Sequence, residues 1–200
     1  MIIGPKYKIC KRLGSNVFEK CQTKAFANSA QRVSDKTGRR NSSDFKRQLL
    51  EKQKLRLIYS LTEKQFSSYV FRALESGQNP SQVLFATLES RLDSFAYRTG
   101  LAQTRRAARQ LAAHGHFTVN GVRVTVPSFA LSVGDVVAVR EGSRGSSLFE
   151  SRRELLKEHK TPSWVTYNPD THSATFTAPP AWGEQDSVAD FGAVFEYYTR

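Results

Sequence analysis

The chain has 200 residues, with 30 Lys and Arg against 18 Asp and Glu, and a formal net charge of +12 at pH 7. This length suffices for one or two domains with a hydrophobic core, and the basic balance favours a polyanionic partner such as a nucleic acid. The sequence contains neither the roughly 20 consecutive apolar residues of a membrane-spanning helix nor a secretory signal, so we expect no membrane partner.

The positive charge is concentrated in two regions. Residues 1–56 hold 15 basic and 4 acidic residues, and residues 91–160 hold 12 and 6. Residues 57–90 are nearly neutral, and residues 161–200 are acidic. Solubility alone would explain a scattered excess of basic residues but not this clustering, so the two basic regions are the candidate nucleic-acid contacts.

The first 41 residues form a basic segment with few candidates for a core. Turn-forming and charged residues fill Ser34–Ser42, which we expect to be a loop. Because the segment repels itself, it is expected to be an arm that is mobile in the free protein and ordered on RNA. We expect at least two of its aromatic residues, Tyr7, Phe18 and Phe26, to pack rather than to stack on an exposed base.

The pattern of residues 43–90 indicates three helices. Ser43 or Asp44 caps the first, Thr62 starts the second, and Pro80 opens the third. Their leucine and aromatic stripes recur near helical spacing, and we interpret them as core rather than as a base-stacking platform.

An arginine-rich helix is predicted next. Thr104 can cap its start, and Gly115 can end it in the left-handed conformation. Arg105 and Arg109 lie four residues apart and share a face, whereas Arg106 points about 100° away from Arg105. A solvated face is the usual role of such charges, but planar guanidinium groups also match phosphate oxygens two at a time, which makes the helix a candidate reader of RNA backbone.

Short strands follow that helix. Phe117 and Val119 alternate with polar residues, Asn120–Gly121 fits a two-residue hairpin turn, and Val122–Val126 continues the alternation. A further strand is predicted at Val136–Val139. The helix and strands together predict a small α/β module.

The last segment, residues 145–200, mixes helix and strand signals. It starts with a helical pattern around Leu148, continues in two short strands at Trp164–Tyr167 and Ala174–Thr177, and closes in a short helix or strand at Phe191–Tyr198. Its apolar faces are too short for a core of their own, which is consistent with packing on the helical block.

The order of these motifs resembles the S-four RNA-binding domain family. Within the module the resemblance rests on Arg91-Leu92-Asp93, Tyr97-Arg98, Thr104-Arg105, Ala108-Arg109-Gln110-Leu111, His114, Val119-Asn120-Gly121, Val126-Pro127-Ser128 and Val133-Gly134-Asp135-Val136-Val137. Outside the module, the matching sequence motifs are Gly4-Pro5-Lys6, Ser43-Asp44-Phe45, Gln48-Leu49-Leu50-Glu51-Lys52-Gln53-Lys54, Tyr59, Glu63-Lys64-Gln65-Phe66 and Trp164. From residue 4 to its C-terminus the chain therefore resembles the bacterial-type ribosomal protein S-four family.

The resemblance implies an α+β fold. A mainly helical domain, residues 42–90 plus 145–200, would carry the S-four-type α/β RNA-binding module as an insertion at residues 91–144, after a basic N-terminal arm at residues 1–41. The implied function is that of a structural constituent of the small ribosomal subunit, which binds rRNA early, nucleates assembly and contributes to translational accuracy. The implied partners are small-subunit rRNA, ribosomal protein S-five and mRNA at its entry path.

The expected RNA contacts come from the arm, the helical block and the module. They are Lys6, Lys8, Lys11, Arg12, Arg39, Arg40, Lys46, Arg47, Lys54, Arg56, Arg91, Arg98, Thr104, Arg105, Arg106, Arg109, His114 and Asn120. The loop before Arg39 is shorter than the family pattern, being reduced to Lys36-Thr37-Gly38, so contact of Arg39 and Arg40 with mRNA is left open. The ribosome would be that of a bacterial cytoplasm or, alternatively, of an organelle that encodes its own copy.

No metal and no cofactor is expected. Some members of the family hold zinc with four cysteines in the N-terminal region, but this chain has Cys10 and Cys21 there, and Tyr7 where a paired ligand would stand. The first histidine is His114, so a closed set of four Cys or His ligands is not available nearby.

Three alternatives share the same module. A pseudouridine synthase places its catalytic aspartate in an Arg-Leu-Asp triplet, which Arg91–Asp93 spells, but only about sixty residues follow the module here. A tyrosyl-tRNA synthetase would need a catalytic fold for which the chain has no room. A free RNA-binding regulator would not need the basic arm and the helical block. We therefore expect no enzyme.

Overall fold

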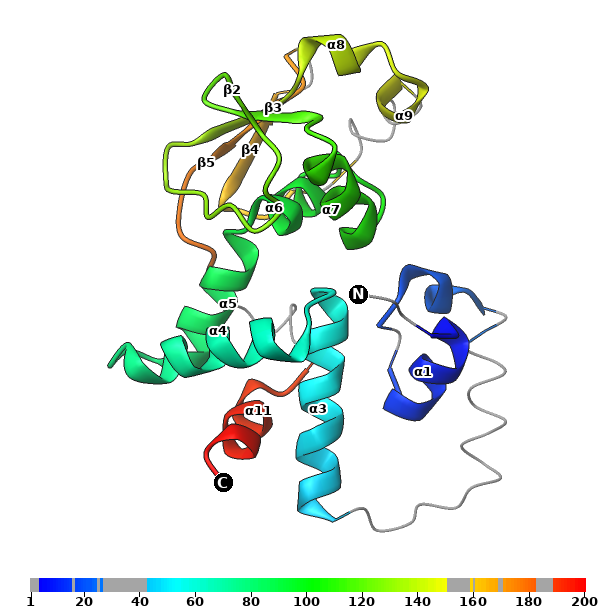
Figure 1. The fold of residues 1–200 in the computed structure, drawn as a ribbon, viewed down its shortest axis with the longest axis vertical. Helices are drawn as coiled ribbons and strands as arrows, with labels where there is room; N and C mark the ends of the chain where they lie inside the picture. Colours follow the sequence, from blue (N-terminus) through cyan, green and yellow to red (C-terminus); the bar gives the residue numbers. More distant parts are fainter. Residues whose placement is uncertain are drawn as a thin grey trace. The chain divides into compact units, whose positions relative to one another are not determined.

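The structure, a computed structural model, describes residues 4–15, 17–24, 26, 43–150, 159, 161–168, 171–182 and 189–200. It divides into two compact units, which are drawn in Figure 1. The first unit contains residues 1–81 and 183–200, and the second contains residues 82–182. The second unit is thus inserted into the sequence of the first.

Helices build the first unit. They are α1 (Lys6–Leu13), the short 3-10 helix η1 (Glu19–Gln22), α3 (Asp44–Ile58), α4 (Glu63–Glu75) and α11 (Phe191–Tyr198). The C-terminal helix α11 packs against α3 and α4, so early and late parts of the sequence meet in this unit.

Side-chain caps explain where these helices begin. Ser43 accepts a hydrogen bond from the backbone N of Lys46 at 3.4 Å, and Thr62 forms a capping box with Gln65. Asp190 caps α11 by accepting from the backbone N of Ala193 at 3.2 Å. These caps confirm the helix starts predicted at Ser43 and Thr62, and the ambiguous element at residues 191–198 is a helix.

The described part of the N-terminal segment has a small core, which the sequence did not lead us to expect. Phe18 and Phe26 are buried, whereas Tyr7 is 50% exposed and stacks on Phe26 at 5.5 Å between ring centroids. The cluster consists of Cys10, Leu13, Phe18, Cys21, Phe26 and Leu57 of α3. Packing of two aromatic residues is confirmed, and the widely spaced apolar residues of this segment meet because two short helices fold against α3. Mobility of the arm in the free protein and its ordering on RNA stay a prediction.

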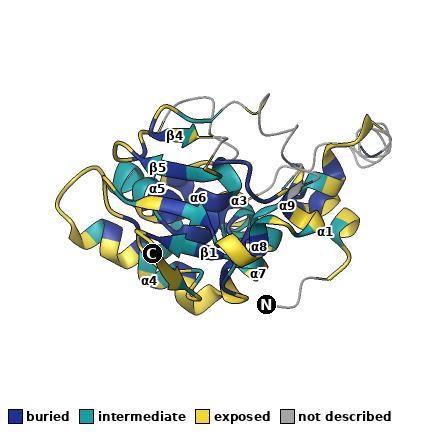
Figure 2. Ribbon diagram, turned by 90° about the horizontal axis from the view of Figure 1, so that it is seen from above, coloured by how far each residue is buried: buried dark blue, intermediate teal, exposed yellow. Residues whose placement is uncertain are grey.

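The second unit joins helices to a sheet. Its helices are α5 (Pro80–Glu89), which begins at the unit boundary, α6 (Leu92–Arg98), α7 (Arg105–Ala113), α8 (Glu141–Arg144) and α9 (Ser147–Glu150). All of α6 except its last two residues is buried, and Figure 2 shows α6 and the strand β5 in the colours of buried and intermediate residues.

The sheet has five antiparallel strands in the order β2-β1-β3-β5-β4. The strands are β1 (Phe117–Val119), β2 (Val122–Val124), β3 (Val136–Val139), β4 (Val165–Asn168) and β5 (Ser173–Phe176). Phe95 of α6 meets Phe176 of β5 edge to face, which places α6 on one face of the sheet.

The hairpin turn between β1 and β2 agrees with the sequence prediction. Asn120 and Gly121 both have positive φ, at 50° and 84°. Positive φ at both central residues is the requirement of a type I′ turn, which suits the right-handed twist of two paired strands.

The unit boundaries differ from the predicted domains. Strand β5 pairs with β3 in the register Val137↔Ala174, so β5 and its partner β4 extend the sheet of the module, and residues 145–182 belong to the second unit. Only residues 183–200 return to the first unit, and α5 lies almost wholly in the second. The predicted division into 42–90 plus 145–200 and 91–144 missed this because strand pairing across the sequence leaves no local signal. The α+β class with an inserted module is confirmed, and no helix in the described parts of the chain is long and apolar enough to cross a membrane.

Candidate nucleic-acid interface

Helix α7 presents two arginines at the surface of the second unit. Thr104 caps the helix by accepting from the backbone N of Ala107 at 3.0 Å, and Ala108 and Ala112 are buried. Arg106 is exposed and Arg109 is half-buried. Because successive helical residues turn by about 100°, these two arginines share a strip beside the buried face. We call Arg106 and Arg109 the basic strip.

Arg105 is held inside the unit, contrary to expectation. Its Nη2 donates to Oε1 of Glu89 at 2.9 Å, and its guanidinium lies over the ring of Tyr97 at 4.7 Å from the centroid. The side chain is only 11% exposed. Arg105 therefore anchors α7. The arginines of this helix that remain candidates for RNA contact are Arg106 and Arg109.

Arg98 converges on the same carboxylate. Its Nε and Nη2 donate to the two oxygens of Glu89 at 3.0 Å each, and the side chain of Glu89 is fully buried. One buried acid thus joins α5 to α6 and α7. We had expected Arg98 and Arg105 to contact RNA. The sequence alone does not show which arginines pair with a buried carboxylate.

Arg91 lies even deeper. It is 2% exposed, and its Nε and Nη2 donate to Asp93 at 2.9 and 2.6 Å. Leu92 lies in the core, and Asp93 forms a salt bridge with Arg91. Burial removes Arg91 from the surface that RNA could reach, which corrects its place among the expected contacts.

Asn120 and His114 lie on the surface of the module, but Asn120 already has partners. Its Nδ2 donates to Oδ1 of Asp135 at 2.8 Å, and its Oδ1 accepts from the backbone N of Val136 at 2.9 Å. These bonds fix the hairpin to β3, so the residue is structural. His114 is exposed at the C-terminal end of α7.

Arg123 is a basic residue of the module that the sequence analysis missed. From β2 it donates to the backbone oxygens of Gly115 at 3.2 Å and of His114 at 3.0 Å, and thereby caps the C-terminal end of α7. Gly115 has φ 73°, and a Cβ there would collide with the guanidinium of Arg123. In the sequence, Arg123 is a lone arginine in a short predicted strand. Nothing in that pattern indicates that it caps the end of a helix.

His116 lies among positive charges. Its Nδ1 is 3.0 Å from Oγ of Ser143, and burial lowers its pKa, with His114, Arg140 and Arg123 lowering it further. Since these groups converge on one imidazole, the C-terminal end of α7 is a positively charged region of the module.

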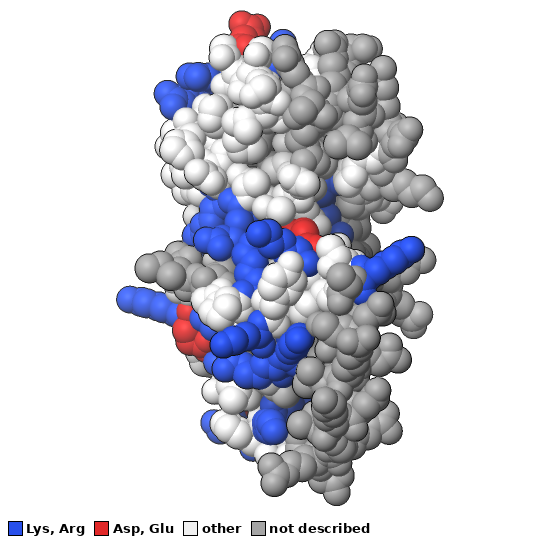
Figure 3. Space-filling view, turned by 90° about the vertical axis from the view of Figure 1, so that its right-hand side faces the viewer, with Lys and Arg blue, Asp and Glu red and all other residues white. Residues whose placement is uncertain are grey.

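The basic residues of α1 remain at the surface. Lys8, Lys11 and Arg12 are exposed, and Lys6 lies over the ring of Phe18 at 5.6 Å from the centroid. Figure 3 draws the Lys and Arg side chains of the described residues in blue, and several of them reach the surface. Arg39 and Arg40 lie outside the described residues.

The basic residues of α3 mostly have acidic partners. Lys46 is exposed, but Arg47 pairs with Asp190 at 3.2 Å, Lys54 with Glu51 at 2.5 Å and Arg56 with Glu63 at 3.5 Å. The first of these pairs is well exposed and therefore weak, so Arg47 can exchange its partner for a phosphate more easily than Lys54 can.

A network around Glu63 connects α3, α4 and α11. Buried Lys52 and Tyr198 each donate to Oε1 of Glu63 at 2.7 Å, and Lys52 lies over the ring of Tyr197 at 4.6 Å from the centroid. Burial opposes ionisation of Glu63, but the bonds from Lys52 and Tyr198 outweigh it and hold the pKa of Glu63 below its usual value. The charge of Lys52 is thus neutralised within the unit.

The two cysteines of α1 and η1 are buried free thiols. Cys10 and Cys21 are both buried, and burial together with the neighbouring Cys10 raises the pKa of Cys21 to about 12. A metal binds the thiolate, and a thiol with this pKa stays protonated at neutral pH. Within the residues the structure describes, no group of three or more His, Cys, Asp or Glu is placed to hold a metal.

Comparison with known proteins agrees with this architecture. Residues 1–89 match the family model described as ribosomal protein S4/S9 N-terminal domain, and residues 90–137 match the S4 domain. The small ribosomal subunit protein uS4 of Roseiflexus castenholzii is 38% identical over 204 residues, which cover 99% of this chain and 98% of that protein. The chain belongs to the uS4 family. The uS4 proteins of Thermotoga maritima and Acetivibrio thermocellus are each 36% identical, over 98% of both chains compared.

Membership in the uS4 family decides between the alternatives. The family consists of structural, non-enzymatic constituents of the small ribosomal subunit that bind rRNA. The Arg91–Asp93 triplet, which a pseudouridine synthase would use for catalysis, is here a buried ion pair. The protein is not an enzyme, and the S4 domain match at residues 90–137 overlaps the module predicted at 91–144.

Proposed function

We propose that this chain grips small-subunit rRNA with the basic strip of α7, Arg106 and Arg109, and with the exposed basic residues of α1. One observation carries this assignment: Arg105 is held by Glu89, whereas Arg106 on the same helical turn is exposed. The exposed guanidinium of Arg106 can meet phosphate oxygens without release from Glu89, which Arg105 would need. His114, Lys46 and Arg47 are further candidate contacts because they reach the surface as well.

Recognition would rest on RNA backbone and shape. An A-form RNA helix hides its base edges in a deep, narrow groove, so proteins that bind it contact mainly phosphates and 2′-hydroxyls. A rigid helix with two arginines on one strip suits this kind of contact, because Glu89 and Thr104 fix the orientation of α7.

Family membership supports a role in assembly. A protein that binds several rRNA helices early would nucleate the subunit, with ribosomal protein S-five as a neighbour and mRNA at the entry path as a further contact. Contribution to translational accuracy belongs to the same proposal. The bacterial relatives favour a bacterial cytoplasm, and an organelle that encodes its own copy is the alternative.

The salt dependence of rRNA binding tests the basic strip. In the double variant Arg106→Ala/Arg109→Ala, affinity for the protein's own small-subunit rRNA should fall. The slope of log affinity against log salt should flatten by about 0.7–0.9 for each phosphate that the variant no longer neutralises. Arg72→Ala, which changes an exposed arginine of α4, is the matched control and should leave the slope unchanged.

The opposite pattern would refute the assignment. If the double variant kept the wild-type slope while Arg105→Ala flattened it, the RNA contact would come from Arg105 after release from Glu89. Thermal unfolding of each variant is measured alongside, because removal of the Arg105 side chain should also destabilise the unit.

A further inference from the structure

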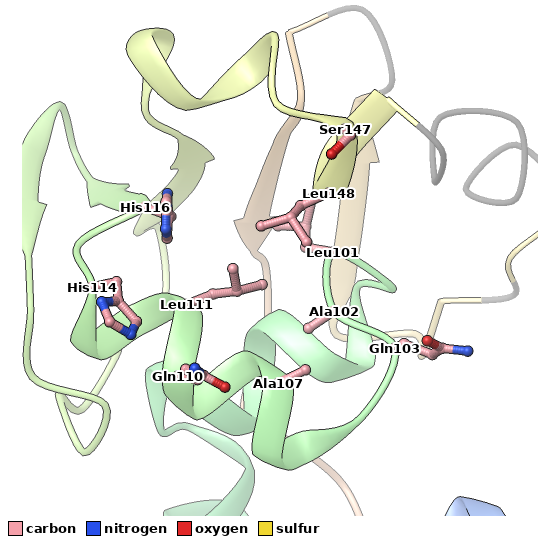
Figure 4. A pocket seen from close by; sticks show the side chains of 10 residues that line it. All are labelled: Leu101, Ala102, Gln103, Ala107, Gln110, Leu111, His114, His116, Ser147 and Leu148. Atoms are coloured by element: carbon pink, nitrogen blue, oxygen red, sulfur yellow. The ribbon is translucent and has the colours of Figure 1, made fainter.

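A pocket of about 530 Å³ lies beside the basic strip in the second unit. Figure 4 shows its walls: Leu101 and its neighbours from the segment before α7, the exposed side of α7 itself, and Ser147 and Leu148 of α9. The ten lining residues that the structure describes belong to this unit. Neither the family resemblance nor the salt-dependent grip proposed above assigns it a ligand.

The pocket and the basic strip are adjacent on one helix. Gln110 lies about 40° around α7 from Arg106, and the other helical wall residues, Ala107, Leu111 and His114, follow further in the same direction. Ala108 and Ala112 occupy the buried side. Helix α7 therefore offers three consecutive strips, which are core, phosphate-directed arginines and pocket wall.

The lining of the pocket combines apolar surface with a few polar groups. Leu101, Leu111 and Leu148 form apolar walls, and Leu148 is 55% exposed although it is a large hydrophobic residue. Gln103 and Gln110 add amides, each of which can donate and accept, and no hydrogen bond of either amide is found in the described part of the chain. Such a lining suits a flat, partly apolar ligand with hydrogen-bonding edges.

The positive charge at one end of the pocket indicates that the ligand also carries a negative group. His114 and His116 line that end, and Arg123 and Arg140 are close enough to act electrostatically on His116. Among the lining residues that the structure describes, none carries a carboxylate. An occupant with a negative group beside its flat part therefore fits better than a neutral or cationic one.

We propose that the pocket receives the base of one unpaired rRNA nucleotide, whose flanking phosphates meet Arg106 on one side and the histidine end on the other. Sequence-specific RNA recognition commonly uses bases that are splayed out, placed against aromatic or apolar side chains and hydrogen-bonded at their edges. This inference rests on the proposed rRNA binding and adds a base-reading site to a grip that is otherwise made to the backbone.

The test fills the pocket without changing any charge. Ala107→Trp places an indole against the walls, and Ala178→Trp, at an exposed position outside the pocket, is the matched control. Full-length variants bind an in vitro transcript of the protein's own small-subunit rRNA, and binding constants are measured over a salt series. Base-specific chemical modification of the same transcript follows the accessibility of each unpaired nucleotide.

The expected result has three parts. Ala107→Trp weakens binding by about tenfold or more, because one base can no longer stack and hydrogen-bond in the pocket. Its salt slope stays at the wild-type value, and one unpaired nucleotide that the wild-type protein protects becomes reactive. Ala178→Trp changes none of these. In contrast, failure of the proposed backbone grip would appear as an unchanged slope in Arg106→Ala/Arg109→Ala, so the two proposals fail separately.

Wild-type affinity and wild-type protection in a folded Ala107→Trp variant would overturn the inference. Wild-type rRNA affinity combined with poor incorporation into reconstituted subunits would overturn it as well, since the pocket would then hold a protein segment. Should Ala107→Trp unfold, Gln110→Ala replaces it. That variant keeps the fold and must lose protection of the same single nucleotide if the amide reads the base.

Discussion

Helices α1 and α3 are both basic and pack against each other, yet their charges are placed differently. Lys8, Lys11 and Arg12 of α1 are exposed, and we find no ion pair for them among the described residues. On α3, Lys52 and Lys54 each donate to a carboxylate. The charge of α1 is therefore available to a polyanion, whereas much of the charge of α3 already stabilises the first unit.

The same contrast occurs between neighbours in α7. Arg105 binds Glu89 and stacks on Tyr97, while Arg106 is exposed. Both comparisons show that the number of basic residues predicts a nucleic-acid partner, but the positions of the acidic residues decide which basic residues remain available to it.

Removal of the Glu89 side chain should lower the stability of the protein more than any other change predicted here. In Glu89→Ala, Arg98 and Arg105 lose their common buried partner, which should destabilise the protein by about 3–5 kcal/mol, as expected when one member of a buried ion pair is removed. Urea unfolding measures the change. Glu141→Ala removes an exposed acid from the same unit and is the control. Equal stability of the two variants would mean that Glu89 does not anchor α7.

Replacing a lysine of α3 should lower the stability more than replacing a lysine of α1, but by less than Glu89→Ala does. Lys52→Ala removes the bond to Glu63 and the packing of the ammonium on two tyrosine rings, so we expect about 1–2 kcal/mol lower stability. Lys11→Ala should keep the stability within about 0.5 kcal/mol and lower rRNA affinity instead. Thermal unfolding and filter binding on both variants decide the comparison, and a destabilised Lys11→Ala would contradict it.

The smallest expected effect is that of a chelator on the N-terminal core. Because Cys10 and Cys21 are buried and the pKa of Cys21 is raised to about 12, the protein should contain well below one zinc per chain and keep its unfolding temperature in EDTA. Both thiols should react with a thiol reagent only after unfolding. A stoichiometric zinc that resists chelation would show that further ligands exist.

Local features of this fold were predictable from the sequence. Ser43, Thr62 and Thr104 cap helices where they were expected, and Asn120–Gly121 adopts the turn that its residue types favour. Caps and tight turns depend on a few neighbouring residues, so a single sequence carries enough information to place them.

Long-range partners were not predictable. Pairing of β3 with β5 moved residues 145–182 into the second unit, and the buried carboxylate of Glu89 paired with Arg98 and Arg105. The capping role of Arg123 was missed for the same reason. Each of these depends on a contact between residues whose sequence neighbourhoods give no hint of it, and a basic side chain looks alike whether it will meet an acid or remain in water.

The insertion of the second unit has a consequence for the order of folding during synthesis. Helix α11 supplies Glu196 to Gln48 and Tyr198 to Glu63, so the first unit is incomplete until the last residues have been made. At about 5–20 residues per second, residues 82–182 delay α11 by roughly 5–20 s after α4 is complete. During that interval the second unit can fold, whereas the apolar surface of α3 and α4 that α11 covers remains exposed. The part of the chain that is made first is thus the part that finishes last.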